Sequence, residues 1–162
     1  MASRVALLFL LCVLPSMVAA IRSHKNPFCV QGRVYCDACR AGFETSATTY
    51  ISGAEVVVEC KDRNTAEVMF SKKGVTDSTG TYKILVNEDH QDHICSAKLV
   101  SSPQGNCQEA APGRDEALVV LTRNNGIASD DRFANSLGYM KTEADSACTE
   151  ILRQYQMFDE EN

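Results

Sequence analysis

The 162-residue chain contains no tryptophan, and aromatic residues make up only 7% of it. This shortage argues against a platform on which sugar rings would stack. No Asn-x-Ser/Thr sequence is present, so N-glycosylation is not expected. The nucleophile-elbow pattern of the α/β-hydrolases is also missing. The residues alone therefore point to no catalytic constellation.

Long hydrophobic runs are scarce as well. The one long apolar run, Val5 to Leu14, follows Arg4 and is too short to span a membrane. Val18-Ala19-Ala20 then offers the pattern that signal peptidase reads. We expect residues 1–20 to be a cleaved signal peptide rather than an anchor, and residues 21–162 to form a single domain.

Positive charge is in short supply once this signal is removed. The signal holds one basic residue and no acidic one, which leaves 15 basic and 21 acidic residues and a net charge of −6. A surplus of negative charge disfavours binding to nucleic acids and to anionic membranes. We therefore expect neither nucleic acid nor a membrane among the partners.

Cysteine, in contrast, is plentiful. Seven remain after the signal: Cys29, Cys36, Cys39, Cys60, Cys95, Cys107 and Cys148. In an oxidising compartment most of them should pair, and one must be left over. Seven choices of the odd cysteine and 15 pairings of the other six give 105 schemes, so spacing alone does not decide the pairing.

Short segments of alternating hydrophobicity dominate the rest of the chain. Within 54–61, Val56, Val58 and Cys60 share one face and charged residues the other, which is typical of a half-buried strand in an antiparallel sheet. Near the end, the spacing from Cys148 to Tyr155 predicts a short helix. Further strands are expected over 28–36, 67–71, 82–86, 94–100 and 117–122, so the residues predict an all-β sandwich or barrel.

The motif Cys36-Asp37-Ala38-Cys39 is open to three interpretations. Redox motifs of this spacing sit at a helix N-terminus beside a βαβ unit, and no such pattern surrounds this one. Zinc binding would need a second pair of ligands, for which His93 and Cys95 are candidates. In an exported chain we favour structural disulfides.

The stretch His90-Gln91-Asp92-His93, flanked by Glu88 and Asp89, could bind a metal through imidazole and carboxylate groups. Its His-x-x-His spacing suits a helix, yet the segment falls between two expected strands. We therefore favour a solvated acidic loop, and we expect neither a metal requirement nor a cofactor.

One stretch resembles a known family. Residues 31–40, Gln-Gly-Arg-Val-Tyr-Cys-Asp-Ala-Cys-Arg, followed by Ala41-Gly42-Phe43, are similar to the signature of the olive major pollen allergen family, the Ole e I-like plant extracellular proteins. The likeness continues through Gly53-Ala54, Glu59-Cys60-Lys61, Asp89-His90, Cys95, Cys107, Leu137-Gly138 and Cys148. A looser likeness of 53–58 and 76–84 to transthyretin-like modules agrees with it. Together they imply an antiparallel β-sandwich or barrel of about seven strands, transthyretin- or immunoglobulin-like, stapled by disulfides and with a short C-terminal helix.

The family resemblance also implies three disulfides, Cys36–Cys107, Cys39–Cys148 and Cys60–Cys95. Cys29 is then an extra, unpaired cysteine beside the usual six. Alternation in this strand places it on the same face as Gln31, opposite Phe28 and Val30. A side chain pointing into the sandwich would be a buried and unreactive thiol. We favour the other outcome, an accessible thiol that can form a covalent dimer.

For function, the resemblance implies a secreted, non-enzymatic plant protein of a kind frequently abundant in pollen and often allergenic. Some members resemble ligands of pollen receptor kinases that support pollen hydration and pollen tube growth. We expect the partner to be a receptor-kinase ectodomain or a cell-wall component, met in the extracellular space or cell wall; the oligomeric state is left open. The alternative is an extracellular enzyme or inhibitor acting on cell-wall polymers, which would need a concave site with convergent titratable groups.

Overall fold

The computed structural model describes residues 26–159, so the expected signal peptide and its cleavage point lie outside the described residues. Ten strands and one helix follow one another along this part of the chain. They are β1 (Phe28–Asp37), β2 (Thr49–Tyr50), β3 (Glu55–Asp62), β4 (Val68–Val75), β5 (Thr81–Val86), β6 (His93–Ser101), β7 (Glu109–Ala110), β8 (Glu116–Val119), β9 (Asp131–Phe133), β10 (Leu137–Met140) and α2 (Cys148–Asp159).

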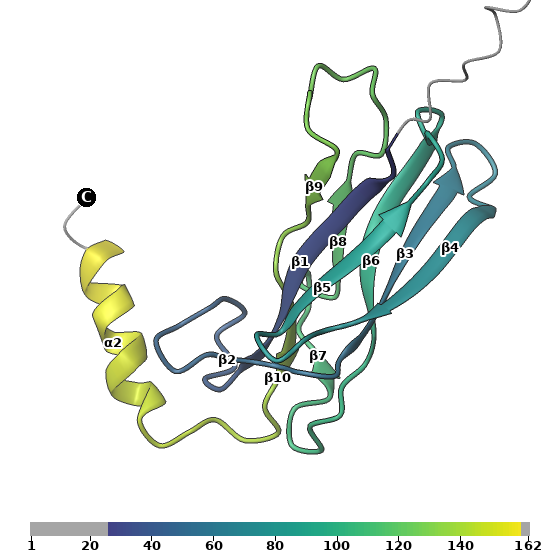
Figure 1. The fold of residues 1–162 in the computed structure, drawn as a ribbon. Coiled ribbons are helices and arrows are strands. Elements are labelled where there is room, and N and C mark those ends of the chain that lie inside the picture. Colours follow the sequence, from purple (N-terminus) through teal and green to yellow (C-terminus); the bar gives the residue numbers. More distant parts are fainter. Residues whose placement is uncertain (1–25, 160–162) are drawn as a thin grey trace, which may run out of the picture.

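The strands form two sheets that pack face to face (Figure 1). The larger sheet has the order β2-β1-β10-β7, with β5 and β9 also paired to β1, and the smaller has the order β4-β3-β6-β8. The expected all-β sandwich is confirmed, and its sheets do not close into a barrel. Two details differ from the expectation: the strands number more than about seven, and β1 runs parallel to both β9 and β10.

β1 organises the larger sheet because it pairs with four other strands. Its first half lies between β5 and β9, and its second half lies between β10 and β2. Gly32, in the middle, faces Tyr82 so closely that a Cβ atom there would lie 2.5 Å from the tyrosine oxygen. Only glycine leaves room for that ring, so the residue marks a close approach rather than a bulge.

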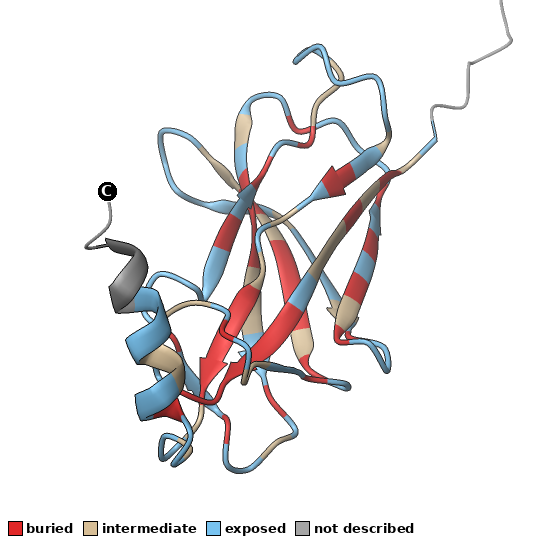
Figure 2. Ribbon diagram, turned by 90° about the vertical axis from the view of Figure 1, so that its left-hand side faces the viewer, coloured by how far each residue is buried: buried red, intermediate tan, exposed pale blue. Residues whose placement is uncertain are grey.

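Buried and exposed residues alternate along several strands (Figure 2), and this period of two decides which side chains face the space between the sheets. On β3, Val56, Val58 and Cys60 are fully buried, as the sequence pattern predicts. Burying a large aliphatic or aromatic side chain contributes roughly 1.5–3 kcal/mol. The largest fully buried side chains are Tyr35, Tyr82, Phe28, Ile51, Leu121 and Leu137.

Three disulfides link distant parts of this sandwich. They join Cys36 to Cys107, Cys39 to Cys148, and Cys60 to Cys95, with Cα separations of 6.0, 5.2 and 4.0 Å. These are the pairs that the family resemblance implies. Because Cys36 and Cys39 bond to different partners, the Cys-x-x-Cys motif forms no disulfide of its own, and the redox interpretation loses its basis.

The helix α2 begins at Cys148 and lies beside the sandwich (Figure 1). It is attached through the Cys39–Cys148 disulfide and through an edge-to-face contact of Phe43 and Tyr155, whose ring centroids are 5.2 Å apart. Just before it, the Asp145 N–H donates a hydrogen bond to the Ala38 carbonyl (3.0 Å). Within residues 26–159, no helix is long and apolar enough to cross a membrane.

Candidate functional site

A cavity of about 180 Å3 opens where the chain between β5 and β6 meets the chain that follows β8. Charged, imidazole and aliphatic side chains all contribute to its wall. Among them are Arg63, His90, His93, Ile94, Leu118 and Val120. We call this feature the histidine cavity.

His90 is a buried polar residue of this wall, with 5% of its surface exposed. Its backbone N–H donates to the Leu121 carbonyl (2.7 Å), and its ring centroid lies 5.0 Å from that of Phe70. Its Nδ1 atom is 3.0 Å from Nδ1 of His93. The expectation of a solvated loop is therefore wrong for His90, because tertiary neighbours cover the ring.

The surroundings of His90 keep its ring uncharged near neutral pH. Burial is the main cause that lowers the pKa of His90, and His93 lowers it further, whereas Glu88 and Asp89 raise it. The net result is a lowered pKa. A neutral imidazole has one bare nitrogen, which can accept a hydrogen bond or bind a metal.

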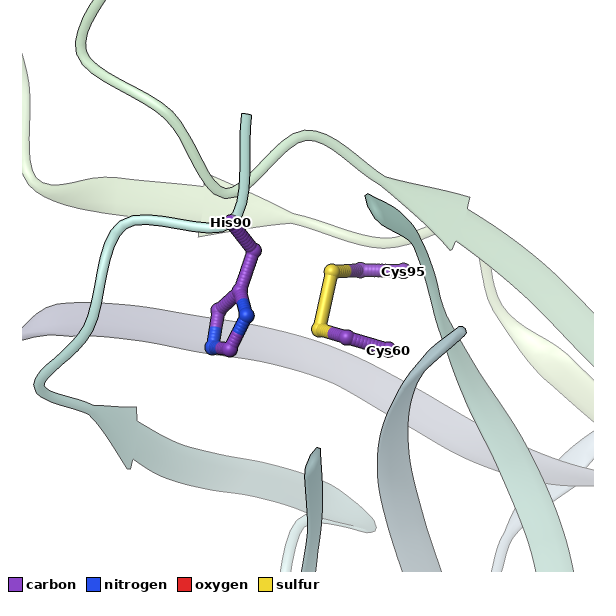
Figure 3. A group of neighbouring side chains, drawn as sticks. All are labelled: Cys60, His90 and Cys95. Carbon is purple, nitrogen blue, oxygen red and sulfur yellow. A yellow bond between two sulfur atoms is a disulfide. The ribbon is translucent and has the colours of Figure 1, made fainter. Parts of the chain in front are cut away.

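The Cys60–Cys95 disulfide lies directly beside the His90 ring (Figure 3). Both sulfur atoms and a ring nitrogen of His90 lie within 4.8 Å of one another. Sulfurs that are bonded to each other are not thiolates, and the thiolate is the form that binds zinc. The Cys95 sulfur therefore cannot serve as the zinc ligand that the alternative of a His93 and Cys95 site requires.

The mouth of the histidine cavity is rimmed by aliphatic side chains that the protein leaves uncovered. Ile94, Leu118 and Val120 are 50%, 71% and 51% exposed. Leu118 belongs to β8, which is an edge strand of the smaller sheet. We call these three residues the aliphatic rim. A hollow bordered by exposed aliphatic groups and a few polar ones is typical of a binding surface.

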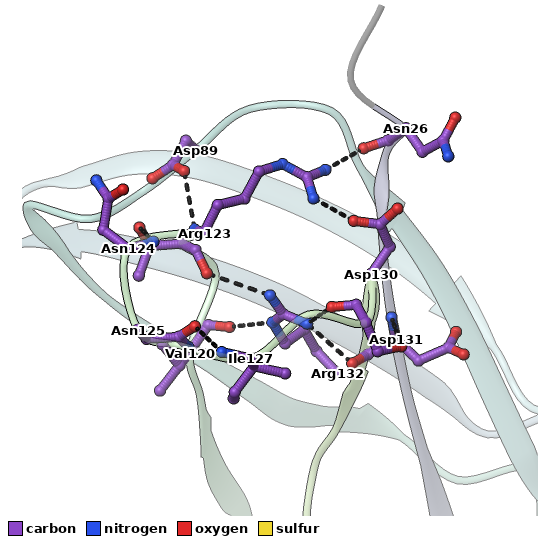
Figure 4. Close-up of polar contacts among 12 residues, drawn as sticks. Asn26, Asp89, Val120, Arg123, Asn124, Asn125, Ile127, Asp130, Asp131 and Arg132 are labelled. Atoms are coloured by element: carbon purple, nitrogen blue, oxygen red, sulfur yellow. Dashed lines mark hydrogen bonds and ion pairs between the residues drawn. The ribbon is translucent and has the colours of Figure 1, made fainter.

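Two arginines fix the chain that borders this cavity (Figure 4). Arg132 is 3% exposed and donates to the carbonyls of Val120 (2.9 Å) and Thr122 (3.2 Å). Arg123 pairs with Asp130, and both guanidinium groups lie over the Phe28 ring, at 4.5 and 4.7 Å from its centroid. The sequence did not predict this role of Arg132, because the residues around it have the composition of a polar loop.

At the other end of β1, the Cys-x-x-Cys turn is shaped by a buried carboxylate. Asp37 is fully buried and accepts hydrogen bonds from the N–H groups of Cys39 (3.0 Å) and Gly42 (2.7 Å). A second cavity, of about 430 Å3, opens near this turn, and its lining is mostly polar: Tyr35, Phe43, Glu44, Arg114, Asn135 and Ser136. Residues 31–40, which carry the family resemblance, thus form a turn and supply cysteines to two disulfides. They do not line the histidine cavity.

The remaining cysteine, Cys29, is unpaired and half-exposed. Phe28 and Val30 beside it are buried, so the alternation predicted along this strand holds. In the sheet, Cys29 lies opposite Leu85 of β5, which is also exposed. The thiol therefore lies on the outer face of the larger sheet.

Comparison with known proteins places the chain among plant proteins. The family described as "Pollen protein Ole e 1 like" matches residues 26–156. The chain is 46% identical to "Protein DOWNSTREAM OF FLC" of Arabidopsis thaliana, over 94% of this chain and 93% of that protein. It is 44% identical to "Pollen-specific protein C13" of Zea mays, over 97% and 92%. It is 40% identical to "Anther-specific protein LAT52" of Solanum lycopersicum, over 98% of each.

A solved structure of a pollen allergen has a similar fold. The crystal structure of the major plantain pollen allergen Pla l 1 superposes with a TM-score of 0.67 at 30% identity, covering 75% of this chain and 99% of that one. Three of the four proteins named above are described as pollen or anther proteins, and none of the four is described as an enzyme. The chain therefore belongs to the family of Ole e 1-like pollen proteins.

Proposed function

We propose that this chain is a secreted, non-enzymatic protein of pollen or another growing plant tissue that acts by binding the ectodomain of a receptor kinase. The observation that carries the proposal is the aliphatic rim beside the histidine cavity. Exposed aliphatic side chains around a hollow suit the insertion of an apolar side chain from a protein partner. The net negative charge would restrict the partner surface to neutral or basic ones.

The absence of enzymatic activity is part of this proposal. The two cavity histidines are hydrogen-bonded to each other through Nδ1, and Nε2 of His90 is buried without a partner, so within residues 26–159 no hydrogen bond joins the His90 ring to a serine or cysteine nucleophile. An enzyme or inhibitor acting on wall polymers is the competing function. Incubating the mature protein with pectin, xyloglucan and callose should release no reducing ends.

A cell-wall component is the second candidate partner. The observation that favours it is the polar cavity near Phe43 and Arg114, whose aromatic and hydrogen-bonding groups suit a saccharide better than an apolar side chain. The two candidates use different ends of the molecule, so variants can separate them.

The test is binding of the purified mature protein to a panel of plant receptor-kinase ectodomains and wall polysaccharides. Leu118→Glu places a charge on the aliphatic rim and should weaken ectodomain binding at least about tenfold. Leu85→Glu is the matched control, because Leu85 is also an exposed leucine (48%) but lies on the other sheet. Binding of no ectodomain, or equal binding by both variants and the wild type, would contradict the proposal.

A further inference from the structure

Two imidazole nitrogens of the histidine cavity lie within hydrogen-bond distance of each other. The His93 N–H donates to the His90 carbonyl (3.0 Å), and this tight turn brings the two side chains together. Their Nδ1 atoms end 3.0 Å apart. The His-x-x-His spacing would suit a helix, but here a turn brings the two histidine rings together.

The separation of the nitrogens indicates which metal geometry fits. With metal–nitrogen bonds of about 2.0–2.1 Å, two ligands at a right angle are roughly 2.9 Å apart, and two at a tetrahedral angle roughly 3.3 Å apart. The observed 3.0 Å is the length of the hydrogen bond between the two rings, and it is compatible with the right angle typical of tetragonal copper(II). We propose that His90 and His93 bind one divalent copper ion through their Nδ1 atoms in the histidine cavity.

The surroundings favour a cation at this point. Glu88 and Asp89 act electrostatically on His90, and His93 acts on the Asp62 carboxylate, so three carboxylates lie near the pair. Arg63 opposes them, but its guanidinium donates to the Gln91 carbonyl (3.0 Å) and holds the turn in place. A cavity of about 180 Å3 also has room for the waters that would complete the coordination, since one water needs roughly 10–15 Å3.

The site is largely built before any ion arrives. The His90 backbone donates a hydrogen bond to Leu121 and its ring packs against Phe70, while His93 is half-exposed. In the protein without copper, one Nδ1 carries a proton and donates it to the other, and copper would replace that proton. The disulfides hold the fold independently, so the ion is a ligand and not a requirement for folding.

The experiment is a copper(II) chloride titration of the mature protein, followed by electron paramagnetic resonance and by competition with a chelator of known affinity. Every variant carries His24→Ala, which removes the only other histidine of the chain. One equivalent should bind, with hyperfine structure from two imidazole nitrogens. His93→Asn should weaken binding at least roughly tenfold and remove one nitrogen from the spectrum.

Gln91→Ala is the matched control, because it changes the same turn without removing an imidazole, and it should retain the affinity. His93→Gln serves as a second variant should circular dichroism show that His93→Asn disturbs the fold. Copper binding that survives both histidine substitutions, or that Gln91→Ala weakens equally, overturns the proposal. So does the absence of stoichiometric binding, which would leave the pair as a hydrogen bond only. Partner binding measured without copper is independent of all these outcomes.

Discussion

At the residue scale, His90 shows how tertiary packing changes the chemistry of a loop side chain. The segment around it is rich in charge, and sequence reasoning treats such a segment as solvated. Phe70, which is distant in sequence, nevertheless packs against the ring, and the Leu121 carbonyl accepts a hydrogen bond from the His90 backbone. No local pattern could reveal this, because these contacts come from two other parts of the chain.

The lowered pKa of His90 predicts a pH dependence of stability. A histidine whose pKa falls on folding stabilises the protein fully above its ordinary value near 6.5, and this contribution is lost as pH falls through the folded value. The urea midpoint should therefore decrease between pH 7 and pH 5. His90→Phe should reduce that decrease, while His24→Ala should not. The pKa values of Asp62 and Asp77 are also lowered, but these carboxylates change the stability only at more acidic pH. They therefore do not contribute to the change between pH 7 and pH 5.

Arg132 predicts a large effect from a single buried cation. Its guanidinium satisfies carbonyls of Val120 and Thr122 that otherwise lack a strand partner on that side. Arg132→Met should lower the free energy of unfolding by about 2–4 kcal/mol, since it leaves these carbonyl oxygens without a hydrogen-bond donor. Arg132→Lys keeps the charge but loses the planar fork, so it should fall between wild type and Met. Denaturant melts that show no loss for Arg132→Met would refute this role.

At the element scale, most strands were predictable and the shortest were not. Alternation in 54–61 and 82–86 identified β3 and β5, because each has one buried face. β9 and β10 escaped prediction, since three or four residues carry no period and their pairing with distant β1 is parallel. The expected strand over 117–122 ends early, at Val119, and the carbonyls of Val120 and Thr122 beyond it accept hydrogen bonds from Arg132.

The candidate site was less predictable than the fold for a similar reason. The strand containing Leu118 is apolar at successive positions, so its sequence does not say which residues face the core. Ala117 and Val119 turn inward, whereas Leu118 and Val120 remain exposed. The aliphatic rim therefore became visible only when the sheet assigned the two faces.

The outer face of the larger sheet predicts the behaviour of Cys29. Cys29 lies between β5 and β9, near Leu85 and with Phe133 exposed (76%) on the neighbouring strand. An exported half-exposed thiol should oxidise, and we expect a disulfide-linked dimer on non-reducing gels that disappears in Cys29→Ser. A dimer band that persists in Cys29→Ser, or a Cys29 that resists alkylation in the native protein, would rule this out.

At the scale of the whole molecule, the Cys39–Cys148 disulfide should contribute most to stability among the three. Its cysteines are 109 residues apart, against 71 and 35 for the others. For such a loop the chain-entropy model gives about 4.7 kcal/mol. The hydrogen bond from the Asp145 N–H to the Ala38 carbonyl already holds the segment before Cys148 in place. Little of the stabilisation is therefore offset by the entropy cost of ordering this segment. Calorimetry of Cys148→Ala should show a lower melting temperature.

Peptide mapping under non-reducing conditions is the direct check on the pairing. A peptide that linked Cys39 to any cysteine other than Cys148 would contradict the expected bridge. The mapping also reports whether Cys29 exchanges with a neighbouring bridge during purification.

Export is the last prediction. The apolar run and Val18-Ala19-Ala20 lead us to expect a mature N-terminus at or near Ile21. Sequencing of protein collected from the medium of expressing plant cells tests it. A secreted form that begins at Met1 would show that the run is not cleaved.

The four pairings of β1 also govern the order in which the protein can assemble. Among the strands of residues 26–159, β1 leaves the ribosome first, yet Val34 must lie beside Leu137 of β10, and Cys29 beside Asp131 of β9. These neighbours are synthesised last, so the larger sheet cannot be completed while translation is in progress. Strand pairs so distant in sequence form slowly and leave an apolar edge open meanwhile. We expect newly made chains to depend on chaperones and disulfide isomerases until the final strands arrive.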